Sequence, residues 1–298
     1  MVLSQRERHV PRACTGFCGD RNGARRPVPL LAGLAFESRR SAASDLVERH
    51  LHVLKRIFGF LFVIASLIVS GVPLAHAGEP TALELVKHYD EVMSPITFDA
   101  LMTMVAHRQD GTTRSYKFRG LKSGNDKVRA WFFEPAAAKG QEMLRVGDNM
   151  WVYMPNLKRS IRIAARESFQ GGDFNNGDIL RVNYVVDYNA KLVASDDAAL
   201  WTLDLAVKTK EATYDRVKLW MSKNKRMPVR AEYYAASGKL LRSAKFEDVK
   251  TFRGFERPSR IMMRNELATQ RFSELTMLDI KINVETPPQK FVIDDLGR

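Results

Sequence analysis

Small or apolar side chains recur at every second position over much of the chain beyond Pro95, and short turn sequences interrupt this pattern many times. Positions 100, 102, 104 and 106 are Ala, Met, Met and Ala, and Asp110-Gly111 is a hairpin turn signal directly after them. Short strands joined by tight turns predict a meandering antiparallel sheet. One face of such a sheet packs inward and the other is solvated, and a long meander curls into a barrel or half-barrel.

The predicted strands share a short length and are bounded by Gly, Asn or Ser-Gly turns. They cover residues 100–107, 116–119, 128–133, 143–146, 150–154, 182–193, 200–207, 214–221, 229–235, 240–246, 260–266 and 273–282. The stretch Ala164 to Asp178 is different because it is rich in Gly, Asn and Asp and lacks a clear strand pattern. Long irregular loops in compact domains are often functional, so we expect part of the site there.

One helix is predicted, over Thr81–Met93. Thr81 and Glu84 form a capping box, in which each side chain satisfies a free backbone N–H of the other residue. The apolar residues that follow fall on one helical face, and Ser94-Pro95 ends the helix. The residues of this face are Leu85, Val86, Tyr89, Val92 and Met93.

Residues 53–77 have the layout of a secretory signal peptide. Lys55 and Arg56 precede an uncharged, mostly apolar run over 57–75, and Ala75-His76-Ala77 is a small-x-small cleavage site. We predict cleavage after Ala77 and a periplasmic location. The alternative is a single transmembrane anchor, since the apolar run is just long enough to span a bilayer. Pro73, the cleavage site and the polar sequence beyond it favour the signal peptide.

Residues 1–52 are Arg-rich, lack an amphipathic period and hold both cysteines, Cys14 and Cys18. We interpret them as a disordered N-terminal extension from a start codon assigned too early, with a genuine cytosolic extension as the alternative. Residues 78–298 are expected to form one domain. Residues 78–298 hold 36 basic and 29 acidic residues, and their net charge of +7 suits anionic head groups or acidic partner proteins. An exported protein meets few nucleic acids, and none is expected as a partner.

Two neighbouring segments are distinctive. The sequence Met150-Trp-Val-Tyr-Met-Pro-Asn-Leu-Lys-Arg159 is followed closely by Ser168-Phe-Gln-Gly-Gly-Asp-Phe174. Together they resemble the periplasmic outer-membrane lipoprotein-sorting family, the LolA-like and LolB-like half-barrels, with Gly172 in place of a small Ser. The resemblance implies a mainly β fold: an incomplete antiparallel barrel with an N-terminal helix and a short helical lid over an apolar cavity.

The resemblance also implies a function. Exposing acyl chains to water costs about 0.8 kcal/mol per CH₂. We therefore expect a periplasmic carrier that shields lipid or lipoprotein acyl chains on the way to the outer membrane, without a cofactor. Its partners would be the acylated cargo and an inner-membrane exporter or outer-membrane acceptor. The alternative is a non-enzymatic accessory subunit that docks on an envelope lipid exporter.

The candidate site residues fall into three groups, and the alternation does not say which strand face lines the cavity. Methionine suits an adaptable lining, although for any single methionine ordinary core filling is the favoured explanation. The aromatic loop residues could also simply anchor their loop, and the cations could form a solvated strand face. The candidates are Met102, Met104, Trp131, Phe133, Trp151 and Tyr153 for the lining, Leu157, Phe169 and Phe174 for the lid, and Lys158, Arg159, Arg162 and Arg166 for head-group or partner contact.

The sequence gives little support to an enzyme or a metal site. Residues 78–298 contain two histidines, His88 and His107, no cysteine, no G-x-S-x-G and no H-E-x-x-H motif. Residues 173–178 superficially suggest a calcium loop, but the spacing misses the D-x-N-x-D-G pattern and Tyr184 stands where the closing Glu is needed. We expect no catalytic residue and no metal.

Overall fold

The computed structural model describes residues 78–268 and 270–298, so the predicted signal peptide and the extension before it lie outside the described residues. The described residues form one compact unit with a hydrophobic core of its own. A unit with its own core is expected to fold independently. Within the residues described, no helix is both long and apolar enough to span a membrane.

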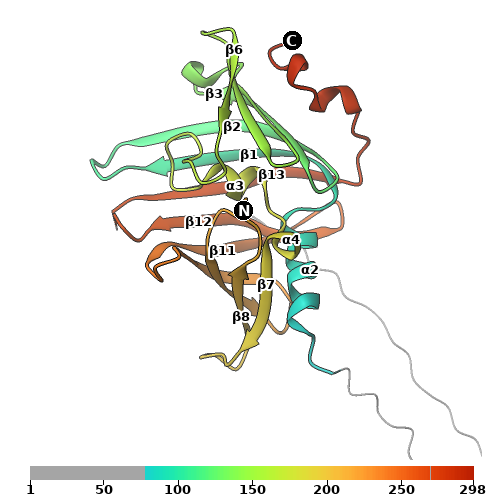
Figure 1. The fold of residues 1–298 in the computed structure, drawn as a ribbon, viewed down its shortest axis with the longest axis vertical. Coiled ribbons are helices and arrows are strands. Elements are labelled where there is room, and N and C mark those ends of the chain that lie inside the picture. The colour runs from blue at the N-terminus through green and yellow to red at the C-terminus, as the bar shows by residue number, and fades with distance from the viewer. Residues whose placement is uncertain (1–77, 269) are drawn as a thin grey trace, which may run out of the picture. The chain divides into compact units, whose positions relative to one another are not determined.

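Thirteen strands form one antiparallel sheet with the order β6-β5-β4-β3-β2-β1-β13-β12-β11-β10-β9-β8-β7. The sheet curves but does not close, because the end strands β6 and β7 are not paired with each other (Figure 1). The predicted mainly β, incomplete barrel is therefore confirmed. The strands are β1 Thr97–His107, β2 Thr113–Ser123, β3 Lys127–Glu134, β4 Glu142–Val146, β5 Asn149–Met154, β6 Arg159–Ile163, β7 Tyr188–Val193, β8 Leu200–Val207, β9 Arg216–Ser222, β10 Pro228–Tyr234, β11 Leu240–Phe252, β12 Phe255–Asn265 and β13 Phe272–Ile282.

Few helices accompany the sheet. The α-helices are α2 Ala82–Met93, α3 Asn176–Leu180 and α4 Tyr184–Asp187, and the 3-10 helices are η1 Ala136–Ala138, η2 Pro288–Phe291 and η3 Ile293–Asp295. The capping box of α2 is present, with the Glu84 N–H donating to Thr81 Oγ1 at 3.2 Å. All five residues of its predicted apolar face are buried. Full burial of a Leu or Val side chain contributes about 1.5–3 kcal/mol, so packing holds this helix in place.

The sheet has two faces with different cores. The inner face carries Met102 and Met104 of β1, and cross-strand pairing continues it through Phe118 of β2 to Phe132 of β3. It belongs to the main hydrophobic core, to which α2 contributes its buried face. The outer face carries a smaller core, in which Phe291 and Leu296 pack with Leu121 and Leu144. Residues 284–298, the C-terminal strap, supply Phe291 and Leu296.

One local prediction is corrected by the structure. Residues 182–193 are not one strand, because Tyr184–Asp187 is the short helix α4 and only β7 is extended. The Asp90 carboxylate of α2 accepts the N–H groups of Tyr184 and Val185, both at 2.9 Å, and thereby caps α4. The predicted strand over 150–154 corresponds to β5, and residues 155–158 form a turn that leads into edge strand β6.

Candidate functional site

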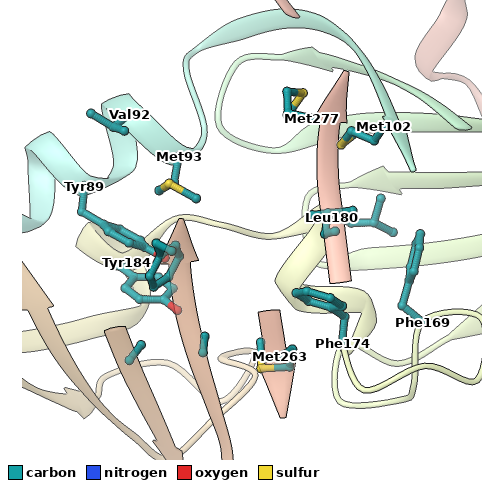
Figure 2. Close-up of a cluster of buried hydrophobic side chains, with 14 of the residues drawn as sticks. Tyr89, Val92, Met93, Met102, Phe169, Phe174, Leu180, Tyr184, Met263 and Met277 are labelled. Carbon is teal, nitrogen blue, oxygen red and sulfur yellow. The ribbon is translucent and has the colours of Figure 1, made fainter. Parts of the chain in front are cut away.

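Residues 164–187, here called the lid segment, connect edge strand β6 to edge strand β7 and include α3 and α4. Phe169 and Phe174 of this segment are almost fully buried in the main core. The Phe169 ring packs against Phe118 and Phe132 of the inner face, with ring centroids 5.4 and 5.8 Å apart. Figure 2 shows Phe169, Phe174 and Leu180 pointing into the same buried cluster as Met102 and Met263. These two rings, here called the plugs, therefore fill space at the inner face, and their role in a lid stays a prediction.

Polar contacts fasten the same loop to the sheet. The Asp173 carboxylate is buried and accepts the Ser273 hydroxyl of β13 at 2.9 Å, while the Asp173 N–H donates to Ser273 Oγ at 2.9 Å. A Cβ on Gly172 would lie 3.1 Å from Ser273 Oγ and 3.2 Å from Met104 Cε. The loop therefore sits directly on the inner face at β1 and β13.

A second anchor lies at α3. The Asp178 carboxylate caps the helix at the Asn175 N–H and accepts the Tyr214 hydroxyl at 2.8 Å. Burial raises the pKa of Asp178 to about 6, against the opposing effect of these hydrogen bonds. A Cβ on Gly177 would stand 2.0 Å from Thr213 Oγ1, so only glycine fits between α3 and the residues before β9.

The space enclosed under the lid segment is small. One cavity of about 40 Å³ remains, enough for one or a few water molecules. Buried tyrosines and Asp178 form much of its wall, and Tyr89 stacks on Tyr184 at 4.7 Å. The inner face is filled by the protein's own side chains in this closed arrangement. The tyrosines of the wall are Tyr89, Tyr184, Tyr188, Tyr214 and Tyr233.

The six predicted lining residues are divided between the two faces. Met102 and Met104 are buried on the inner face, as a lining requires. The expectation that the other four share that lining is wrong, because a strand sends successive side chains to opposite faces and these four occupy the other parity. Trp131, Trp151 and Tyr153 pack with the outer-face core, and Phe133 is 44% exposed.

The outer-face core has an ionic centre that the sequence analysis missed. Arg129 of β3 is completely buried and forms ion pairs with Glu142 of β4 and Asp295 of the strap, the latter at 2.6 Å. It also donates to the backbone carbonyls of Lys290 and Asp295 at 2.9 and 2.7 Å. Arg129 therefore clamps the C-terminal strap onto the sheet, beside Trp131.

The predicted basic cluster is exposed and lies along β6 and its flanks. Arg162 hydrogen-bonds to the Asn149 side chain of neighbouring β5. Arg166 turns away, donates to the Ala212 carbonyl at 3.1 Å and pairs with Asp215 at 3.2 Å. Leu157, Lys158 and Arg159 lie at the exposed turn and strand start. The head-group or partner role of this cluster stays a prediction.

Three other cations lie buried at the inner face, and the sequence analysis overlooked them. Lys122 of β2 donates to the Ser94 carbonyl and hydroxyl at 2.6 and 2.7 Å, and Arg257 of β12 donates to the Met93 carbonyl at 3.4 Å. Arg145 of β4 donates to the carbonyls of residues 125, 147 and 180 at 2.8–3.1 Å. The acceptors of these hydrogen bonds are carbonyl and hydroxyl oxygens, and no carboxylate among the described residues accepts a hydrogen bond from these three side chains.

Removal from water dominates the electrostatics of these cations. Burial lowers the pKa of Lys122 to about 8 and the pKa of Arg145 and of Arg257 to about 10. Lys122 and Arg257 gain about 0.3–2 kcal/mol from the negative end of α2, whereas burying an ion costs several kcal/mol. Nearby carboxylates oppose this decrease in pKa, Asp90 for Lys122 and Asp187, Asp126 and Asp148 for Arg145.

The residues described offer no group of three or more His, Cys, Asp or Glu side chains that could hold a metal ion. The carboxylates of Asp173 and Asp178 instead hold the lid segment in place, because each accepts a hydrogen bond from a hydroxyl group of the protein.

Comparison with known proteins decides the family. A crystal structure of a LolA superfamily protein from Nitrosomonas europaea is 30% identical, with a TM-score of 0.66, and the match covers 72% of this chain and 99% of that one. The chain belongs to the LolA superfamily. A family model whose description reads "-like: Uncharacterized protein" matches residues 124–298. No curated protein matches the chain.

Two further solved structures share the LolA fold at 21% identity. A DUF1329 family protein from Desulfovibrio piger has a TM-score of 0.65, with 72% of this chain and 97% of that chain covered. A putative outer membrane lipoprotein-sorting protein domain from Vibrio parahaemolyticus has a TM-score of 0.63, with 73% and 98% covered. At this identity they support the half-barrel architecture alone.

Proposed function

We propose that this LolA superfamily protein is a non-enzymatic carrier that shields the acyl chains of a lipid or lipoprotein against the inner face of its half-barrel. The carrier works in the periplasm after removal of the signal peptide, receives cargo from the inner membrane and delivers it towards the outer membrane. The putative outer membrane lipoprotein-sorting protein domain from Vibrio parahaemolyticus, which shares the fold, motivates this class of cargo.

The observation that carries the proposal is the construction of the inner face. An unclosed sheet presents buried methionines and aromatic rings there, and α2 and the lid segment pack against them. Methionine adapts to chains of varied shape, and an open edge between β6 and β7 lets the cover move. The methionines of this core include Met93, Met102, Met104, Met143, Met150, Met263 and Met277.

Cargo loading requires the lid segment to move, because the enclosed cavity of about 40 Å³ is far too small for an acyl chain. The plugs Phe169 and Phe174 occupy the space that cargo would take. When they leave the inner face, acyl chains replace them as apolar partners, so loading exchanges one set of buried surface for another.

A disulfide that locks the lid segment tests this function. Residues 78–298 contain no cysteine, so the double variant Gly172→Cys/Ser273→Cys has a clean background. A Cβ at position 172 would lie 3.1 Å from the γ-atom of residue 273, a spacing compatible with a disulfide. We expect purified residues 78–298 to take up phospholipid from vesicles when reduced and to lose uptake when oxidised, as measured by native mass spectrometry.

The single variant Ser273→Cys is the matched control, because it loses the same hydroxyl but cannot lock the lid. Equal uptake by the oxidised and reduced double variant would contradict a moving lid. Absence of uptake by the unmodified protein would contradict the carrier function itself.

The filled interior favours a second candidate, the accessory subunit that docks on an envelope exporter. A groove of about 400 Å³ on the outer face brings Trp131 and Phe133 together with Arg119 and Lys290. Under this alternative, Phe133→Ser weakens exporter binding and the disulfide that locks the lid segment leaves exporter binding unchanged. If the protein is a carrier, Phe133→Ser leaves phospholipid uptake unchanged and the locked lid abolishes it.

A further inference from the structure

Strand β6 lies at one end of the sheet and has a free edge. It pairs with β5 alone, and among the described residues its backbone forms no other hydrogen bond. Alternate residues of an antiparallel strand direct their N–H and C=O groups away from the neighbouring strand, so part of the β6 backbone faces outward unpaired. Helix α2 packs beside the other end strand, β7, at the opposite end of the sheet from β6 (Figure 1). The edge of β6 is therefore the one open to a further strand.

The hairpin that carries this edge has charge of one sign. Residues 149–163 contain Lys158, Arg159 and Arg162 and no acidic residue, and all three cations are exposed. None of the three forms an ion pair with a carboxylate of the described residues, whereas Arg166 of the lid segment pairs with Asp215. Like charges along an edge hinder pairing with a second copy of the chain and attract an acidic strand instead. The hairpin is thus complementary to negative charge.

Open space adjoins the far end of this edge. A groove of about 510 Å³ is lined by Arg162 and Ile163 of β6 and by residues 210–212. Its other charged lining residues are of both signs, so the groove gives room for a chain without a charge preference of its own. These residues are Arg166, Arg181, Lys210, Asp148, Glu167 and Glu211. The preference for an acidic partner therefore comes from the β5–β6 turn and from β6 itself.

The geometry of β6 determines where such a partner carries its acidic residues. Arg162 pairs with Trp151 of the outer-face core. Arg159 has the parity of Ile161, which packs against the main core, so the two arginines lie on opposite faces of the strand. A strand laid against β6 places its side chains opposite those of β6 on the same face. Its carboxylates therefore stand at two positions separated by two residues, with an apolar residue opposite Ile161.

We propose that β6 binds an acidic extended segment of a partner protein, which adds an antiparallel strand to the free edge with one carboxylate opposite Arg159 and another opposite Arg162. Main-chain hydrogen bonds hold the segment and the arginines select it. An anionic membrane surface would meet the same cations but leave the backbone edge unpaired, which favours a peptide. This edge is separate from the inner face, so the inference goes beyond the carrier function and applies equally to an accessory subunit.

The first test measures peptide binding to purified residues 78–298 by isothermal titration calorimetry at pH 7 and low ionic strength. The probe, acetyl-Thr-Val-Glu-Val-Thr-Glu-Glu-Thr-amide, has two Glu residues at the derived spacing, Val opposite Ile161 and a third Glu opposite Lys158. We expect it to bind, and the same peptide with Gln in place of every Glu to bind more weakly. Added salt should reduce the difference, because it screens exposed charges.

Methylation of the peptide backbone tests strand addition itself. Two further probes are N-methylated at alternate residues, one at the odd and the other at the even positions. An added strand directs only alternate N–H groups at its neighbour, so we expect one methylated probe to lose binding and the other to keep it. Hydrogen exchange should show that the binding peptides protect N–H groups over residues 159–163.

The double variant Arg159→Gln/Arg162→Gln removes the charges that select the segment and keeps the strand. We expect it to bind the probe about two- to thirtyfold more weakly, the range for two cross-strand ion pairs. The matched control is Lys239→Gln/Lys245→Gln, which removes two exposed positive charges at β11. It makes the same change in net charge far from β6 along the sheet and should keep the affinity within about twofold.

Weaker binding by Arg159→Gln/Arg162→Gln, together with loss of binding by one methylated probe alone, supports the inference. Equal binding of the Glu and Gln peptides, equal losses in the two double variants, or the same behaviour of both methylated probes overturns it. Absence of peptide binding also overturns it, and capture of dioleoyl phosphatidylglycerol vesicles by the same arginines would then assign them to a membrane surface. Phospholipid uptake at the inner face tests the carrier function separately in every case.

Discussion

The Asp90 carboxylate of α2 accepts the main-chain N–H of Tyr184 at 2.9 Å and caps α4 from 94 residues away in the sequence. The neighbouring Val185 N–H donates to the same carboxylate, so one side chain joins the N-terminal helix to the lid segment. Burial is the largest influence on this group and raises its pKa to about 6, even though both N–H bonds oppose the change. The contact that fastens the lid is therefore sensitive to pH near neutrality.

Stability should rise as the pH falls from 7 to 5. The folded pKa of Asp90, about 6, lies above the unfolded value near 3.9, so the folded state binds the proton more tightly. The stabilisation appears as the pH falls through 6 and is complete below the unfolded pKa. We expect Asp90 to contribute about 1 kcal/mol to the increase in unfolding free energy between pH 7 and 5, measured by urea denaturation.

The variant Asp90→Asn should lose that share of the pH dependence. The exposed Asp126→Asn, on the β2–β3 turn, is the control and should keep the whole of it. Each variant keeps all the other ionisable side chains, so the comparison isolates the contribution of Asp90. Identical pH profiles for Asp90→Asn and the unmodified protein would disprove the assignment.

Gly177 should not tolerate alanine, because a Cβ there would lie 2.0 Å from Thr213 Oγ1. We expect Gly177→Ala to lower the unfolding free energy by about 1–3 kcal/mol, the range for overpacking. Thr213→Ala removes the obstructing hydroxyl. Thermal and urea unfolding of the two single variants and the double variant should therefore show partial rescue, and additive losses would rule out this contact as the cause.

Adjacent phenylalanines on β3 test the assignment of the two faces. Phe132 packs against the Phe169 plug, whereas Phe133 is exposed on the outer face. We expect Phe132→Ala to lower the unfolding free energy by about 3–5 kcal/mol and Phe133→Ala to change it by less than about 0.5 kcal/mol. Similar losses in urea unfolding for the two variants would show that the register of β3 is wrong.

Local signals in the sequence predict most of the fold. The capping box and apolar face of α2 lie within one helix, and the Asp110-Gly111 and Gly147 turns lie within their hairpins. The alternation of apolar residues could not show which face is inner, because the aromatic Trp131 and Phe133 fit either parity. The structure resolves this through cross-strand pairing, which places Phe132 beside Phe118.

The parts that sequence analysis missed depend on distant contacts. Helix α4 needs the Asp90 cap, and the strap needs Arg129, which is 166 residues from Asp295. Lys122 offered a signal, since it continues the inward parity of Tyr116 and Phe118 along β2. A charged residue at an inward position was the clue to the buried cations.

Arg129 and Arg119 provide the last prediction, because both guanidinium groups lie over the Trp131 ring, at 5.0 and 5.7 Å, but differ in burial. Arg129→Met leaves Glu142 buried without its partner, and breaking such a pair costs about 3–5 kcal/mol. Arg119→Met breaks the half-exposed pair with Asp99, which is worth at most about 1 kcal/mol, and leaves no buried charge without its partner.

The two variants should also differ in how they hold the C-terminal strap. Loss of Arg129 removes its bonds to Lys290 and Asp295, so limited trypsin digestion should cleave after Lys290 in Arg129→Met and spare Arg119→Met. Equal protection of the strap in both variants would mean that Phe291 and Leu296 hold it by packing alone, and that Arg129 serves the sheet and not the strap.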